Sequence, residues 1–338
     1  MIGALNTLTT AQLQEGSNPA LLALGARTAV QNELFNMFDM TQDGFATISE
    51  IAPGQSGGQI IKVVYRDENT GAAFRKIGEE YTPKNVTQKS ELYEQKLLGG
   101  AFNYDYAMDR FSVANATTRA YWLADQINDK VESIINGFAN SIIKGKVADN
   151  PLSVNGLDYY LSAGQSLANM SDNNVLEIAT STLHTYEGAS KFEEKIRVNI
   201  NKMKGAAPNV IITTEDGKTA LQTVNRTLNK GIMLIKYGSL EYYQFLGLNI
   251  IALPDSYFDE DELAKGIPFY MTRVGRKGVS VVIPDDGQII AIKPPKFATG
   301  KLVEVGSCEM IYVPVIQSIY CVSRCYIDIV ADPEVPGV

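Results

Sequence analysis

The sequence is poor in the residues that build disulfide, metal and catalytic sites. Its 338 residues include three cysteines and one histidine. So few cysteines exclude the disulfide framework of small secreted proteins and fit synthesis in a reducing cytoplasm. The single His184 leaves the chain without the ligands of a usual zinc site and with one candidate base for a Ser/His/Asp arrangement. We therefore expect no catalytic residues, no metal site and no cofactor.

Long apolar runs and basic clusters are also missing. No window reaches the roughly 18 apolar residues of a membrane-spanning helix, and the first residues lack the cationic segment of a secretory signal. The net charge is −8, the pI is near 4.9, and no stretch gathers five or more Lys and Arg. Because phosphate contacts dominate the affinity of nucleic-acid-binding proteins, we expect no tight or sequence-specific grip on DNA.

Periodic segments indicate where helices and strands lie. Residues 118–144 carry the clearest apolar stripe at helical spacing, and at about 1.5 Å per residue this helix would be roughly 40 Å long. Shorter helices are predicted at 19–38 and 191–204, and a third follows the strand at 209–214. Segments after residue 240 are rich in β-branched residues with Gly and Pro between them. This order favours an α+β protein whose late strands pair with segments far back in the chain.

A hairpin is predicted for residues 60–83. A β-branched run, Ile60 to Tyr65, is followed by the turn signal Asn69-Thr70-Gly71 and a second mixed run up to Pro83. Most alternate positions are polar and few large side chains are available as anchors. Such a hairpin finds its partner on another molecule more readily than in its own core.

Residues 39–50, DMTQDGFATISE, nearly match a calcium-binding loop. Asp39, Asp43, Gly44 and Glu50 stand at the expected places. Thr41 replaces a ligand, however, and the glycines and proline that follow contradict an exit helix. The departures favour an ordinary polar turn, with a calcium site as the alternative.

Two further motifs have structural interpretations. Gly217-Lys218-Thr219 resembles the end of a phosphate-binding loop, but Ile212 stands where its first glycine is needed, so Thr214 is predicted to cap a helix instead. The acidic run Asp259 to Glu262 indicates a solvated loop. The cysteines Cys308, Cys321 and Cys325 are expected in the core.

Three segments, in order, resemble the major capsid proteins of tailed bacteriophages, which share the Hong Kong ninety-seven-type fold. Residues 78–111 are similar to the stretch where such proteins leave an extended hairpin, with a Glu, a polar linker, Leu-Gly-Gly, a strand and Asp-Arg-Phe. Residues 154–157, Val-Asn-Gly-Leu, resemble a turn of the family without its aromatic residue. Residues 205–209, Gly-Ala-Ala-Pro-Asn, with the strand after them, resemble the family's entry into the axial domain.

The resemblance implies an α+β phage major capsid fold in four parts. These are an N-terminal arm (1–50), an extended β-hairpin loop with its strands (51–98), a peripheral domain with a long spine helix (99–165 and 271–338) and an axial α/β domain (166–270). In the family the extended loop lies over a neighbouring subunit and the axial domains meet at the centres of hexamers and pentamers, giving an icosahedral shell. Such contacts are heterologous and close into rings.

What the resemblance implies about function is a structural, non-catalytic major capsid protein. Its partners would be copies of itself, with scaffold, portal and decoration proteins, and its shell would enclose double-stranded DNA without sequence-specific binding and without a membrane. It would be found in the virion after assembly in the host bacterial cytoplasm. An encapsulin-type bacterial nanocompartment is the nearest alternative, and a soluble α/β enzyme with a carboxylate site is the alternative from another class.

Overall fold

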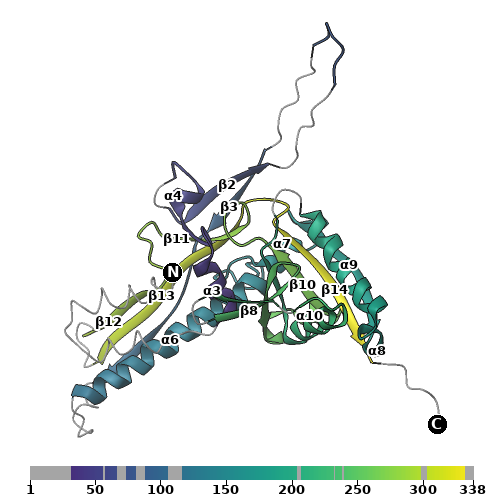
Figure 1. Ribbon diagram of the computed structural model, residues 1–338. Helices are drawn as coiled ribbons and strands as arrows, with labels where there is room; N and C mark the ends of the chain where they lie inside the picture. The colour runs from purple at the N-terminus through teal and green to yellow at the C-terminus, as the bar shows by residue number, and fades with distance from the viewer. Residues whose placement is uncertain are drawn as a thin grey trace, which may run out of the picture.

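The protein consists of two large β-sheets, a long helix and a hairpin that projects from the body (Figure 1). The computed structural model describes residues 32–55, 58–66, 74–80, 88–105, 116–203, 207–231, 233–237, 240–297 and 303–331. The mixture of helices and sheets confirms the expected α+β class. None of the helices in this part of the chain combines the length and the hydropathy that crossing a membrane demands.

The long helix predicted at 118–144 is confirmed as α6 (Ala116–Lys144), which has 29 residues. Its apolar stripe is buried against the strands β4 (Lys96–Asp105) and β13 (Val303–Ile316). The stripe includes Ile127, Val131, Ile134, Ile135, Phe138 and Ile142. A helix of this length is ordinarily stabilised by such a packed face, because propensity alone gives little stability in water. One face of the helix therefore packs against a sheet.

The N-terminal helix predicted at 19–38 is described only from residue 32 onward, as α3 (Glu33–Met40), and residues 19–31 lie outside the described residues. Phe35 and Phe38 of α3 meet the ring of Phe138 edge-on, with centroids 5.5 Å and 5.9 Å away. Phe45, on the strand that follows, lies 5.8 Å from the same ring. Aromatic contacts thus fix this segment to the C-terminal part of α6.

A five-stranded sheet lies over α6. Its order is β1-β11-β13-β12, and β4 also pairs with β13. The strands are β1 (Phe45–Thr47), β4 (Lys96–Asp105), β11 (Val279–Ile283), β12 (Ala291–Phe297) and β13 (Val303–Ile316). The antiparallel pairing of β4 with β13 runs from Lys96 opposite Tyr312 to Asp105 opposite Val303. The expectation that late strands pair with early segments is confirmed.

A seven-stranded mixed sheet forms the second body, in the order β5-β14-β10-β6-β9-β8-β7. Its strands are β5 (Ser171–Ala179), β6 (Val210–Thr214), β7 (Met233–Tyr237), β8 (Leu240–Phe245), β9 (Leu248–Leu253), β10 (Ile267–Thr272) and β14 (Val322–Val330). Helices α9 (Tyr186–Lys202) and α10 (Glu215–Thr227) pack on it and match the predicted helices. The division of the chain into domains stays a prediction.

Short helical elements connect these parts. They are α4 (Ile48–Ile51), α7 (Leu157–Leu161), α8 (Thr180–Leu183), α11 (Glu260–Leu263) and the 3-10 turns η1 (Ala168–Met170) and η2 (Asp255–Tyr257). The chain turns from α6 into α7 by close backbone contact, because the Gly156 N–H donates to the carbonyl of Gly145 at 2.7 Å. A Cβ on Gly156 would lie 2.6 Å from the carbonyl oxygen of Ile143. Only glycine fits this approach.

The predicted hairpin exists, but its second strand was placed wrongly. Strand β2 (Ile60–Arg66) pairs antiparallel with β3 (Gln88–Glu94), and residues 74–80, expected in the second strand, form no strand. The pairing that forms sets Tyr93 opposite Ile61 on the buried face. The run at 74–80 offers no comparable anchor, since its Phe74 and Ile77 are fully exposed.

Candidate assembly surface

The calcium-like segment at residues 39–50 is a tight connection between α3 and β1. The Glu50 carboxylate accepts the N–H of Thr47 at 2.7 Å, which closes a capping box at the start of α4. Gly44 packs so closely that a Cβ would come within 2.1 Å of the carbonyl oxygen of Phe38. Within the described ranges, no three His, Cys, Asp or Glu side chains gather as metal ligands do.

The predicted helix cap at Thr214 is confirmed. Its side-chain oxygen accepts the N–H of Gly217 at 3.2 Å, and Glu215 and Asp216 stand in the first turn of α10. Ile212 lies buried in the middle of β6. The Gly-Lys-Thr sequence therefore begins a helix that is capped by its own chain.

The three cysteines are buried with free thiols, as predicted. Burial raises the pKa of Cys321 and of Cys325 to about 12. Thiols in that condition are weak nucleophiles, because the thiolate is the reactive form. Their role is packing in the core.

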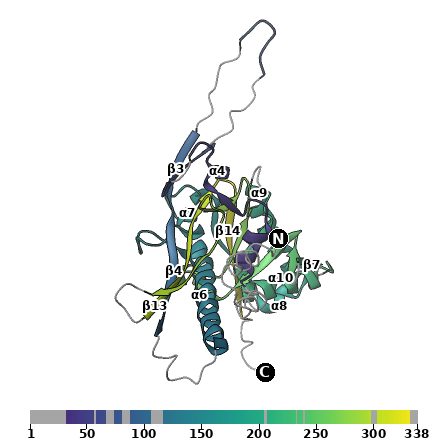
Figure 2. The same cartoon turned by 90° about the vertical axis from the view of Figure 1, so that its left-hand side faces the viewer.

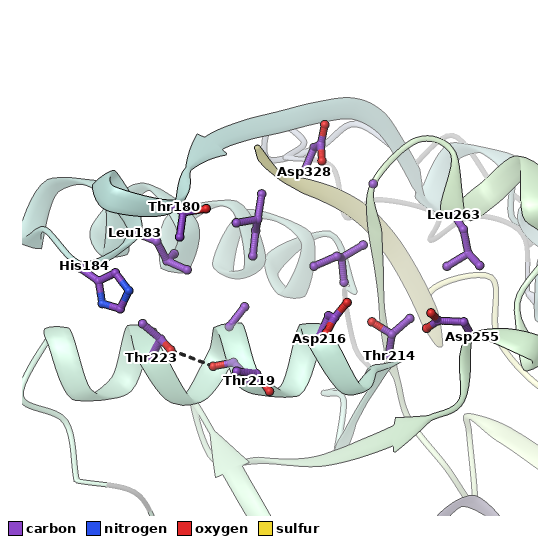
Figure 3. A pocket seen from close by; sticks show the side chains of 14 residues that line it. Thr180, Leu183, His184, Thr214, Asp216, Thr219, Thr223, Asp255, Leu263 and Asp328 are labelled. Carbon is purple, nitrogen blue, oxygen red and sulfur yellow. Dashed lines mark hydrogen bonds between the residues drawn. The ribbon is translucent and has the colours of Figure 1, made fainter. Parts of the chain in front are cut away.

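His184 lies at one end of a cavity of about 560 Å³ between α8, α10 and the end of β14 (Figure 3). At the other end Figure 3 draws Thr214 between Asp216 and Asp255. No hydrogen bond joins His184 to either carboxylate among the described residues. The histidine and the two acids thus lie at opposite ends of the cavity.

The acidic run at 259–262 is only partly a solvated loop, which corrects the expectation. Glu260 and Asp261 are exposed, but Asp259 forms an ion pair with Lys146 at 2.5 Å. Glu262 lies 3.0 Å from the guanidinium of Arg324, a buried residue on β14. The run begins a short helix, so two of its acids turn inward.

The hairpin has one face that is anchored to its own body. Ile61, Val63 and Tyr93 are buried on this face. The Tyr93 hydroxyl accepts the N–H of Ile316 at 3.3 Å, and its one proton has two acceptors in reach, the Glu91 carboxylate at 3.0 Å and the carbonyl of Ile316 at 3.4 Å. Burial raises the pKa of Tyr93 well above its usual value. Tyr93 thus fixes the base of the hairpin to the end of β13, a role that its sequence context did not indicate.

On the opposite face of the hairpin, exposed apolar side chains alternate with the exposed polar residues Lys62, Ser90 and Glu94. Ile60, Val64 and Leu92 point outward there with 60%, 53% and 68% of their surface exposed, and these three residues are named the hairpin face. Beyond it, residues 74–80 lie at the far end of the projection (Figure 1). Isolated apolar side chains on a surface are ordinary, but three of them on one side of a projecting hairpin make the hairpin face a candidate contact surface.

The edge of β2 beside this face is protected. The side-chain amide of Gln55 donates to the carbonyl of Lys62 and accepts its N–H, both at 3.0 Å. Gln55 thereby occupies the hydrogen-bonding positions that a further strand would use. A partner is expected to approach through the hairpin face and not by adding a strand at Lys62.

Comparison with known proteins bears on the fold. No family model matches the chain, and no curated protein is similar in sequence. An encapsulin of Synechococcus elongatus has a similar structure, with a TM-score of 0.56 and 9% identity over 94% of each chain. A protein of Mycobacterium phage Adephagia follows, with a TM-score of 0.50 and 13% identity over 96% of this chain and 98% of that one. The chain therefore has the Hong Kong ninety-seven-type capsid fold.

Proposed function

We propose that the protein is the major capsid protein of a tailed bacteriophage, which assembles into an icosahedral head that encloses double-stranded DNA. The hairpin face carries the proposal, because its apolar side chains are exposed in the described part of the chain and a second copy of the chain packed against them would cover them. The net charge of −8 suits a shell around packaged DNA, because an acidic protein binds the DNA phosphates weakly and does not hold the DNA in place. In this role the protein is structural and catalyses no reaction.

Self-association is the central partnership of this proposal, in hexamers and pentamers. Scaffold, portal and decoration proteins would be its further partners, and assembly would take place in the host bacterial cytoplasm before the protein becomes part of the virion. The four parts predicted from the sequence, at 1–50, 51–98, 99–165 with 271–338, and 166–270, keep their roles as arm, extended loop, peripheral domain and axial domain.

An encapsulin-type compartment that holds a protein cargo is the second candidate. The likeness to the cyanobacterial encapsulin, at the higher TM-score, supports it. Electron microscopy of particles from the native cells separates the two candidates. Closed shells with nuclease-resistant DNA support the capsid, and shells with a protein cargo support the compartment. A monomer or dimer under every condition contradicts both.

The role of the hairpin face is tested by a matched pair of substitutions. Val64→Ser removes an apolar group from the hairpin face, and Val198→Ser removes one from the outer side of α9, where 46% of the valine surface is exposed. We expect Val64→Ser to reduce the yield of shells in sedimentation while the melting temperature of the subunit stays unchanged. A shell yield from Val64→Ser equal to that of the unsubstituted protein would show that the hairpin face is not an assembly contact.

A further inference from the structure

A carboxyl group is buried where α7 meets the seven-stranded sheet. Asp158 on α7 and Arg324 on β14 are each 2% exposed. Oδ1 of Asp158 accepts hydrogen bonds from the hydroxyl of Tyr270 at 2.5 Å and from Nη1 of Arg324 at 2.8 Å. Its other oxygen, Oδ2, is buried and has no hydrogen-bond partner among the described residues. The carboxylate is thus only half satisfied, although burial makes its charge costly.

A second carboxylate competes for the same nitrogen. Oε2 of Glu262 lies 3.0 Å from Nη1 of Arg324 and also accepts the hydroxyl of Tyr326, while Oε1 lies 2.9 Å from Lys265. Arg324 therefore keeps a carboxylate partner when Asp158 loses its charge. The ionisable groups around Asp158 come from β10, β14, α11 with its flanking residues, and the loop after α6: Tyr270, Arg324, Tyr326, Glu262, Lys265, Asp259 and Lys146.

These surroundings favour the protonated form of Asp158. Burial, the largest influence, raises the pKa of Asp158 to about 6, although Tyr270 and Arg324 lower it and Glu262 adds a further increase. A carboxyl group of an unfolded chain titrates near 3.8. The folded protein therefore binds this proton more tightly than the unfolded chain does.

The cluster lies at a contact between two parts of the fold, so protonation of Asp158 acts on that contact. The N–H of Gly156, the residue before α7, is bonded to the carbonyl of Gly145 just past the end of α6. Arg324 and Tyr270 lie on the adjacent strands β14 and β10. Asp158 is thus the buried charged contact that links the segment after the long helix to the second sheet.

We propose that Asp158 is a proton-controlled joint between α7 and the seven-stranded sheet. Protonated, it stays hydrogen-bonded without a buried charge, and Arg324 remains paired with Glu262. Ionised, it carries a buried negative charge and shares the guanidinium with Glu262, which weakens the joint. This inference goes beyond shell formation and does not depend on it.

The sign of the expected pH dependence follows from the two titrations. Between about pH 4 and 6 the folded protein holds the proton that the unfolded chain has lost. The free energy of unfolding therefore falls as the pH rises through this window. Above it, the contribution of Asp158 to this free energy is constant. A difference of about two pKa units corresponds to about a hundredfold change in the unfolding constant.

The test compares the full-length protein with Asp158→Asn, which keeps an accepting oxygen and cannot ionise. We expect the two proteins to unfold alike at pH 4, and the wild type to have an unfolding constant about a hundredfold larger above pH 6.5. Asp172→Asn is the matched control. The pKa of Asp172 is lowered by Lys195 and Asn199 against the effect of burial, so its contribution to stability is lost as the pH falls, the opposite direction.

A ratio of wild-type to Asp158→Asn unfolding constants that stays the same from pH 4 to pH 8 would overturn the proposal. Should Asp158→Asn fail to fold, amide hydrogen exchange of the wild type decides instead. After correction for intrinsic rates, protection of α7 should be greater at pH 5 than at pH 7, and equal protection at the two pH values would also refute the joint.

Discussion

Removing the ring of Phe138 should loosen the N-terminal segment from the long helix. Phe138 is completely buried, and its ring lies within 6 Å of the rings of Phe35, Phe38, Phe45 and Tyr312. Truncating a buried phenylalanine to alanine typically costs about 3–5 kcal/mol. Since four aromatic contacts, each contributing about 0.5–1.5 kcal/mol, are lost together, we expect Phe138→Ala to fall at the upper end, near 5 kcal/mol.

Urea unfolding followed by circular dichroism measures this loss in the unassembled subunit. A domain of ordinary stability unfolds at about 5–15 kcal/mol, so a loss of that size is a large part of the total. Phe138→Leu is the control, because it keeps most of the volume and should lose far less. A loss below about 2 kcal/mol for Phe138→Ala would refute the reasoning, since it would mean that the surrounding rings close the cavity without cost.

Three smaller predictions test local features. Thr214→Ala removes the cap of α10 and should lower the free energy of unfolding by about 1 kcal/mol, whereas Thr214→Ser should not. Gly156→Ala forces a Cβ against backbone carbonyls at the end of α6, and calorimetry should show a lower melting temperature with a loss of roughly 1–3 kcal/mol. The buried cysteines should react with a thiol reagent only after unfolding, and a reaction in the native protein would contradict their burial.

Features that depend on local sequence were predictable. The apolar stripe at 118–144 predicted α6, whose start lies two residues earlier than expected. Thr214, which is followed by two acidic residues, predicted the cap of α10. Both depend on contacts within one helix or with its immediate surroundings. The long-range pairing of late strands was predictable in outline, because strands that follow the helices must pair with segments before them.

Features that depend on distant partners were not predictable. The turn signal at Asn69 to Gly71 placed the second hairpin strand too early, because the strand is chosen by the fit of Tyr93 against β13. Asp158 and Glu262 stood in ordinary polar sequence, and only the fold brings them to one nitrogen of Arg324. The outward side chains of the hairpin face could be assigned only once the register of β2 and β3 was known.

The chain passes from β3 to β4 through the single residue Gln95, so the two strands follow one another along nearly one line (Figure 2). A strand is close to its full extension and cannot lengthen to absorb a pull. Tension on the hairpin therefore travels along β4 and loads its hydrogen bonds with β13 in shear, where many bonds resist together. A force on the hairpin is thereby spread over the whole length of β4 before it reaches α6.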